Sequence, residues 1–233
     1  MTQPEAVRPL IDSGMTRQLE AFRDAIAGGM PRLGWKVAFN DPAVQQRLGL
    51  TATLVGWLDG RRVFLEGQPY QPRAGSKPLA EAEVAVRLSR DVTASTGLDQ
   101  ARAAIAAVAP AIEFANRAKA TAPLDAMIAD DILHDGVLFG PEAPLPAASG
   151  LVEAGFPKVA VNGGPPLLGV PGRYPEDLAE IVVHVANVLT QYGESLRAGD
   201  RIICGAYVAF DIASGDRVEA DFGPLGKLSF TVA

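Results

Sequence analysis

The sequence predicts an α+β protein, rich in short strands and poor in helices, with a barrel-like sheet. Short apolar stretches of β-type composition recur along the chain, and Asp-Gly or Gly-Asp pairs separate several of them. Helical patterns are few, and only the one over 175–193 is long and strongly periodic. The 233 residues, of which 48% are hydrophobic, suffice for one large domain with a sizeable core.

The N-terminal region predicts a helix over 16–28 that Gly28 closes. Its apolar residues recur at spacings of three and four, at Leu19, Phe22, Ala25 and Ile26. Gly29 and Pro31 then break the chain. We therefore expect a small helical segment over 1–32 and a larger domain over 33–233.

The next hundred residues alternate between short strands and short helices. The strands expected here are 35–39, two within 53–65 around an Asp-Gly turn, and 81–88. The helices expected are 41–50, closed by Gly49, and 100–109, stopped by Pro110.

Residues 175–193 give the clearest helix. Pro175 and two acids open it, and Gly193 ends it. Its apolar stripe consists of Leu178, Ile181, Val182, Val185, Leu189 and Tyr192. The polar side carries His184, to which we assign no chemistry. Short strands with glycine turns fill the rest of the chain.

Composition excludes several classes of function. A net charge of −6 and a pI of about 5.0 argue against nucleic-acid binding, which requires a basic face. No apolar run reaches the ~18 residues of a membrane helix, and the N-terminus lacks the apolar region of a secretory signal. The single cysteine, Cys204, is expected in the core. We expect a soluble, cytoplasmic protein.

Two glutamates stand two residues apart in the strand expected at 81–88. Side chains of a strand alternate between faces, so Glu81 and Glu83 share one face with Ala85 and Arg87. This polar face either meets water or carries ligands. The opposite face is apolar and is expected in the core.

A third glutamate, Glu113, stands alone in the apolar stretch AVAPAIEFAN. Glu81 and Glu83 are about 6–7 Å apart at Cα, close enough to share a metal ion. With Glu113 they could bind one Mg²⁺ or Mn²⁺, because such hard cations prefer carboxylate oxygens. Lys36, in LGWKVAFN, either extends its ammonium to water or lies near the metal, where it would bind a substrate carboxylate or move a proton.

A series of segments in one order resembles the fumarylacetoacetate hydrolase superfamily. They are GWKVAFNDPAVQQRLGL, LAEAEVAVRL, APAIEFAN, IADDILHDGVLFG, GESLRAGDRIICGAYV and GPLGKLSFTV. The likeness covers about residues 34–232. It is strongest to the branch of 2-oxopent-4-enoate hydratases and 4-oxalocrotonate decarboxylases of aromatic catabolism.

The resemblance implies a fumarylacetoacetase-like mixed β-roll or barrel with flanking helices over 33–233. It implies a divalent metal at Glu81, Glu83 and Glu113, and an active-site lysine at Lys36. In that branch the metal chelates the carboxylate and the 2-oxo oxygen of a 2-oxo acid and stabilises an enolate. The resemblance also implies a homo-oligomer, and we expect the N-terminal helix to dock on a neighbouring subunit.

The chain departs from the family pattern at three places. Leu54 stands where hydratases carry an acid, Asn116 replaces an Asp, and IADDILHDG replaces an IADNxSS-like segment. A proton carrier is therefore missing or has moved. His134, beside Asp130, Asp131 and Asp135, is the candidate, because a histidine near an acid suits proton transfer. It could also be a structural histidine at a helix end.

Three functions remain open. The first is a metal-dependent lyase for a 2-oxo or 2-hydroxydienoic acid, a hydratase or a decarboxylase. The second is a C–C hydrolase of an acylpyruvate, with His134 as the base that activates water. The third is a non-catalytic metal- or partner-binding subunit. The departure at Leu54 favours the third, and the retained Lys36 and glutamates argue against it.

Overall fold

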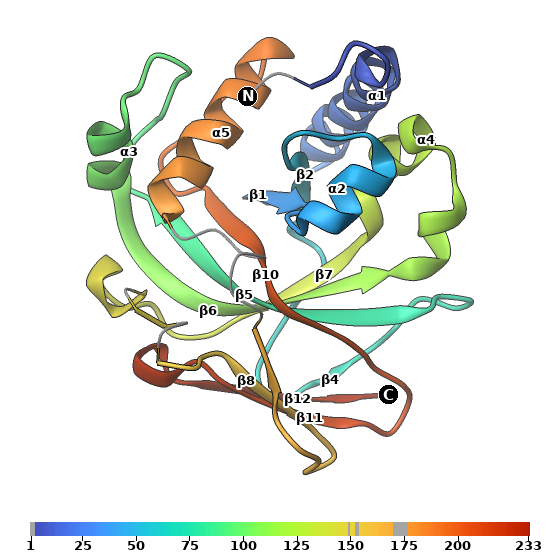
Figure 1. The fold of residues 1–233 in the computed structure, drawn as a ribbon, viewed down its shortest axis with the longest axis vertical. Helices are drawn as coiled ribbons and strands as arrows, with labels where there is room; N and C mark the ends of the chain where they lie inside the picture. Colours follow the sequence, from blue (N-terminus) through green and yellow to red (C-terminus); the bar gives the residue numbers. More distant parts are fainter. Residues whose placement is uncertain (1–2, 149, 152–153, 170–176) are drawn as a thin grey trace.

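The structure is a computed structural model that describes residues 3–148, 150–151, 154–169 and 177–233. Two β-sheets form its body, and the longest helices lie together at one end (Figure 1). The larger sheet has the order β2-β1-β10-β5-β6-β7-β3, and the smaller has the order β4-β12-β11-β8-β9. The predicted α+β class with a barrel-like sheet is confirmed.

The larger sheet consists of β1 (Arg32–Ala38), β2 (Leu54–Asp59), β3 (Val63–Phe64), β5 (Pro78–Leu88), β6 (Ile105–Asn116), β7 (His134–Phe139) and β10 (Arg201–Asp211). The smaller consists of β4 (Pro69–Tyr70), β8 (Lys158–Val161), β9 (Leu167–Leu168), β11 (Arg217–Asp221) and β12 (Lys227–Val232). The α-helices of the described residues are α1 (Arg8–Ala27), α2 (Pro42–Leu48), α3 (Leu98–Ala104), α4 (Leu124–Ala129) and α5 (Leu178–Gln191).

The larger sheet curls into a roll. β2 and β3 are consecutive in the chain but lie at opposite edges of the sheet, so the turn between them brings the edges together. The edge strand β2 also meets β7, the strand next to the opposite edge, since the Asp59 amide donates to Nε2 of His134 over 3.3 Å. Alternate side chains of each strand therefore point into the roll. A compact cluster fills part of this interior with Leu58, Ala85, Ala111, Val137 and Ile203.

The outer face of the roll is covered by helices and by the smaller sheet. Phe22 of α1 packs against Trp35 with ring centroids 4.9 Å apart. On another part of this face Phe114 stacks on Tyr70, with ring centroids 3.9 Å apart, and contacts Phe230 of β12 in an edge-to-face arrangement. One large core thus joins α1, α5 and both sheets.

The N-terminal helix is longer than predicted, since α1 begins at Arg8. Its apolar side is buried in the core of its own chain, through Ile11, Met15, Leu19 and Phe22. This leaves little of that side for a neighbouring subunit. The predicted division at residues 32 and 33 stays a prediction.

The helix predicted over 100–109 is wrong in its second half. α3 ends at Ala104, and β6 runs from Ile105 through Pro110 to Asn116. The alanines suggested a helix, but intrinsic propensity is a weak preference that sheet pairing overrides. β6 is paired with β5 along its length, and Pro110 keeps a carbonyl that accepts a bond from the Gly140 amide.

The C-terminal helix agrees with the prediction within the described residues. Asp177 caps α5 by accepting a hydrogen bond from the Ala179 amide, and residues 175–176 lie outside the described residues. Among the described helices, none combines the length and the apolarity needed to cross a bilayer.

Candidate functional site

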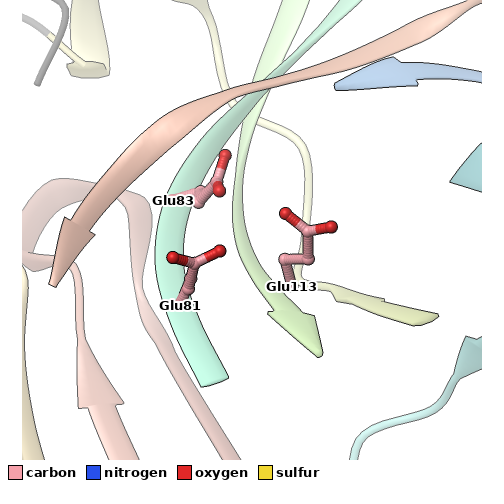
Figure 2. A group of neighbouring side chains, drawn as sticks. All are labelled: Glu81, Glu83 and Glu113. Atoms are coloured by element: carbon pink, nitrogen blue, oxygen red, sulfur yellow. The ribbon is translucent and has the colours of Figure 1, made fainter. Parts of the chain in front are cut away.

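Three carboxylates converge inside the roll. Glu81 on β5 lies directly opposite Glu113 on β6, and Glu83 follows two residues along β5 on the same face (Figure 2). One oxygen from each carboxylate lies within 4.8 Å of the other two. Glu83 and Glu113 are each only 1% exposed and Glu81 is partly buried, so this part of the face lies inside the protein. The interpretation of the glutamates as part of a solvated surface is therefore wrong.

Glu113 is held by two basic side chains. Lys36 Nζ lies 2.9 Å and His134 Nδ1 lies 2.7 Å from the same oxygen, Oε1. Burial alone would raise the pKa of Glu113, but Lys36 and His134 outweigh it and hold the pKa below its ordinary value. Burial opposes the charge of Lys36, yet Glu113 and Asp131 raise its pKa above the ordinary value. Glu113 and Lys36 therefore form a charged pair.

Among the described residues, no cation forms a comparable ion pair with Glu81 or Glu83. Glu83 Oε2 accepts a 2.7 Å hydrogen bond from the Gly205 amide. Burial, together with the charge of Glu113, raises the pKa of Glu83 and raises that of Glu81 to about 7. Glu81, Glu83 and Glu113 thus share one interior, in which Lys36 is paired with Glu113. This donor set fits a hard divalent cation, whose charge would offset the repulsion between them.

The turn 131–133 fixes Lys36. The Ile132 carbonyl accepts a 2.8 Å hydrogen bond from Nζ. All three residues of the turn have positive φ, and Ile132 is β-branched with φ of 42°. Such a residue rarely adopts this conformation, and strain of this kind persists where the surrounding structure imposes it. The turn therefore directs a carbonyl at the site. No pattern in the sequence DDIL predicted this conformation.

Gly56 and Asp131 complete the surroundings of Lys36. A Cβ at Gly56 would lie 2.7 Å from Asp131 Oδ1 and 3.0 Å from Lys36 Cε, so only glycine leaves room for both. Asp131 accepts a 2.9 Å bond from the Trp57 amide, and burial raises its pKa to about 7. Sequence reasoning missed Gly56 and named Asp131 only as an acid beside His134, because their role at Lys36 depends on contact between β2 and the 131–133 turn.

His134 is buried and bound at both ring nitrogens. Nδ1 pairs with Glu113, and Nε2 accepts from the Asp59 amide, so Nδ1 carries the proton in the neutral ring. Its acid partner is thus Glu113 and not one of the neighbouring aspartates. Asp135 instead binds Tyr70, Arg62 and Arg73. These contacts favour a positioning role for His134 over the predicted proton carrier.

Two adjoining cavities lie at the carboxylates. A hollow of about 50 Å³ is lined by Lys36, Glu81 and Glu83 together with Ile132 and Leu133. A second cavity of about 370 Å³ lies beside it. The two share Phe39, Asn40 and Glu81, so one bound molecule can occupy both.

The remaining candidates lie elsewhere. His184 on α5 donates a hydrogen bond from Nε2 to the Thr53 carbonyl over 3.0 Å, and burial lowers the pKa of His184. The side of α5 that carries His184 therefore packs against the protein and is not a solvated face. Leu54 and His184 line a separate cavity of about 300 Å³ that contains none of the three glutamates. Asn116 accepts from the Lys77 and Ala118 amides. Cys204 is buried, as predicted.

The family model described as "Fumarylacetoacetate (FAA) hydrolase C-terminal" matches residues 56–233. A 4-oxalocrotonate decarboxylase from a Pseudomonas species is 26% identical over 238 residues, which span 99% of this chain and 90% of that protein. A 2-hydroxyhexa-2,4-dienoate hydratase from Comamonas testosteroni is 25% identical over 217 residues, which span 91% of this chain and 82% of that protein.

Solved structures share the fold. The 4-oxalocrotonate decarboxylase from Pseudomonas putida G7, complexed with magnesium and adipate, superposes with a TM-score of 0.81 at 22% identity, over 93% of this chain and 83% of that one. A fumarylpyruvate hydrolase from Pseudomonas aeruginosa, in complex with Mn²⁺ and pyruvate, superposes with a TM-score of 0.63 at 16% identity. The latter match covers 88% of this chain and 90% of that one.

Proposed function

Because the chain belongs to the fumarylacetoacetate hydrolase family, we propose that it is a metal-dependent hydratase, a lyase that acts on a 2-oxo or 2-hydroxydienoic acid. The observation that carries the proposal is the convergence of three carboxylates, two of them buried and one partly buried, within 4.8 Å and beside the buried ammonium of Lys36. The dienoate hydratase among the relatives supports the reaction type. A 2-oxo acid is the proposed small-molecule partner.

Glu81, Glu83 and Glu113 would hold one Mg²⁺ or Mn²⁺. Lys36 and His134 both occupy Oε1 of Glu113, and among the described residues Oε2 accepts no hydrogen bond. Glu83 likewise uses Oε2 for the Gly205 amide and keeps Oε1 for a ligand. The cation would supply positive charge that polarises the 2-oxo oxygen of a bound acid. Relatives solved with magnesium and with manganese support this choice of metals.

Lys36 is the proposed acid–base residue. Its ammonium lines the small hollow, and bonds to the Ile132 carbonyl and to Glu113 hold it there. A fixed positive charge stabilises negative charge that develops on the substrate oxygen, and it needs no reorganisation during the reaction. The same ammonium can hold or give up a proton at Nζ.

His134 acts, in this proposal, by orienting Glu113. Its Nδ1–H group fixes one carboxylate oxygen and so directs the other toward the ion. The Asp59 amide at Nε2 selects this tautomer. A carboxylate, a histidine and a backbone amide thus form one chain of hydrogen bonds behind the metal site.

Decarboxylation is the second candidate, because a 4-oxalocrotonate decarboxylase is among the relatives and among the superposed structures. C–C hydrolysis is supported by the superposition on fumarylpyruvate hydrolases and by the hydrolase family model. A non-catalytic subunit is disfavoured, because a cluster of like charges in the interior destabilises the fold and would serve no reaction in such a subunit.

One comparison separates these functions. The protein, loaded with Mg²⁺ or Mn²⁺, is offered 2-hydroxypenta-2,4-dienoate, 4-oxalocrotonate and an acylpyruvate, and ultraviolet absorbance is followed. Conversion of the dienol to a 4-hydroxy-2-oxo acid supports the hydratase. Release of CO₂ or of pyruvate with a second acid would replace it by the decarboxylase or the hydrolase. No turnover of any substrate would contradict an enzymatic function.

We also propose that the chain is a homo-oligomer, as the family resemblance implies. Light scattering at micromolar concentration tests this, and a strict monomer would contradict it.

A further inference from the structure

Asn40 follows β1, the strand that carries Lys36, and its side chain binds the backbone of β10. The ladder that pairs β1 with β10 extends to the pair of Lys36 and Ile203. Further along, Asn40 Nδ2 donates to the Ala206 carbonyl over 3.1 Å, and Asn40 Oδ1 accepts from the Ala206 amide over 3.2 Å. The side-chain amide thus binds both backbone groups of one residue of β10, as a residue of a paired strand can do.

β10 is irregular where Asn40 binds it. Its pairing with β5 shifts register between Ile203 and Ala206, in a stretch that contains Gly205. Gly205 has a φ of 107°, which favours glycine, and its amide donates to Oε2 of Glu83 over 2.7 Å. A Cβ at Gly205 would lie 3.0 Å from Asn40 Cγ, so Asn40 packs closely on this residue. Irregularities of this kind often redirect a group toward a functional site.

We propose that Asn40 is a positioning residue of the metal site, acting on Glu83 through the backbone of β10. Its two bonds to Ala206 fix the direction of the neighbouring Gly205 amide, and that amide orients the Glu83 carboxylate. The inference rests on the proposed function, which places a divalent cation at the three glutamates. Because the Gly205 amide binds Oε2 of Glu83, its direction decides where Oε1 points. Hydrogen bonds behind a metal ligand hold it in the geometry that the ion requires.

The chemistry of the Asn40 side chain matches this role. Ala206 presents one donor and one acceptor, and an amide side chain offers the complement of both. A carboxylate of the same shape could accept but not donate. It would also add negative charge beside Glu81 and Glu83, which line the same small hollow as Asn40. An alanine could do neither, so substitutions separate the two bonds from the shape of the side chain.

Mg²⁺ binding to the Asn40→Ala protein, measured by calorimetry, tests the consequence at the metal. We expect the affinity to fall about 10–100-fold, the usual effect of removing a group that orients a metal ligand. Asn162→Ala is the matched control. Asn162 accepts from the Arg217 amide and donates to Asp216, so it also binds a neighbouring strand, but it follows β8 of the smaller sheet. Its loss should leave the Mg²⁺ affinity unchanged.

A single NMR signal reports on the Gly205 amide. Cys204 is the only cysteine of the chain, and it directly precedes Gly205. Isotopic labelling of cysteine at the carbonyl carbon and of glycine at the nitrogen therefore selects one amide. Its hydrogen bond to Glu83 shifts the amide proton downfield, so Asn40→Ala should move the signal of the metal-free protein upfield. Asn40→Asp keeps the shape and the bond from the Ala206 amide, and it should move the signal less.

Each outcome decides a different claim, once circular dichroism has established that a variant is folded. An unchanged Gly205 signal in Asn40→Ala, or a moved signal with unchanged Mg²⁺ affinity, would overturn the inference and leave the proposed function intact. An equal loss of affinity in Asn162→Ala would overturn it too, because the effect would then be general. If Asn40→Ala does not fold, Asn40→Asp decides, and an unchanged signal in that variant would overturn the inference. Failure of the parent protein to bind Mg²⁺ would overturn the proposed metal site, and this inference with it.

Discussion

Lys36 and His134 bind the same oxygen of Glu113, at 2.9 Å and 2.7 Å, although they come from opposite ends of the curled sheet. Lys36 lies on β1, which is near one edge, and His134 begins β7, which is near the other. Closure of the roll is therefore what assembles the site. Both contacts fall on one oxygen of Glu113, which leaves the other for the proposed metal ion.

Replacing Glu83 by Gln should abolish binding of Mg²⁺ or Mn²⁺, measured by calorimetry. The glutamine side chain carries no negative charge and has one oxygen where the carboxylate has two. The backbone amide of Gly205 already donates to one carboxylate oxygen of Glu83, so a single oxygen could not serve both this amide and a metal ion. Glu81→Gln and Glu113→Gln should weaken binding as well. Glu219→Gln is the control, because Glu219 is exposed on a strand of the smaller sheet. Unchanged affinity in all three site variants would reject the metal site.

Lys36→Met should lower kcat by about two to four orders of magnitude, the usual worth of a positioned acid–base group, and leave metal affinity intact. Methionine fills much of the same volume but carries no charge or proton. Lys77→Met, at an exposed position, is the control. Circular dichroism of the variant establishes that it is folded. A folded Lys36→Met protein with the parent kcat would remove Lys36 from the mechanism.

His134→Gln distinguishes positioning from proton transfer. If His134 orients Glu113, the variant should bind metal about 10–100-fold more weakly. We expect kcat at saturating metal to fall about 10- to 1000-fold. His184→Gln is the control, because His184 lies in the separate cavity. Intact metal affinity combined with loss of a rate inflection near pH 6–7 would instead support the proton carrier.

Asp131→Asn should make stability less dependent on pH. Burial raises the pKa of Asp131 in the folded protein from its ordinary value of 3.8 to about 7. Between these values the folded state binds the proton more tightly than the unfolded state, so the stability of the parent protein falls as pH rises through this window. Asparagine does not titrate and can still accept from the Trp57 amide.

Urea unfolding without metal at pH 4.5 and pH 8 measures this effect. The variant should gain on the order of 1 kcal/mol or more relative to the parent at the higher pH. Asp130→Asn is the matched control, since the Asp130 side chain is 63% exposed. An equal stability difference at both pH values would show that Asp131 does not titrate in this range.

Gly34→Ala should destabilise the fold by roughly 3 kcal/mol or more, judged by urea unfolding. A Cβ at Gly34 would lie 1.9 Å from the Arg201 carbonyl oxygen, and its φ of 138° disfavours a side chain. The contact is with backbone of β10, so β1 would have to separate from its partner. Gly97→Ala is the control, because nothing lies within 4 Å of its Cβ position. Similar stability of the two variants would contradict the close approach.

The sequence alone determined the candidate residues of the site and the class of fold. Glu81 and Glu83 share a face because strand side chains alternate, and Glu113 and Lys36 stand out as lone charges in apolar stretches. The ordered segments carried the family resemblance that implies one site for all four residues. Spacing within one strand is a local property. The shared face of Glu81 and Glu83 therefore does not depend on the tertiary contacts of the rest of the chain.

Only the tertiary structure decided that the glutamate side of that strand also lies inside the protein, and what each side chain contacts. The partner of His134 is 21 residues away, and the carbonyl that holds Lys36 is 96 residues away, so neither bond has a local signal. The same holds for the strand at 105–116, where pairing with β5 overrides the helical preference of alanine. Closure of the roll fixed these contacts, because it brings β1, β2 and β7 around one interior.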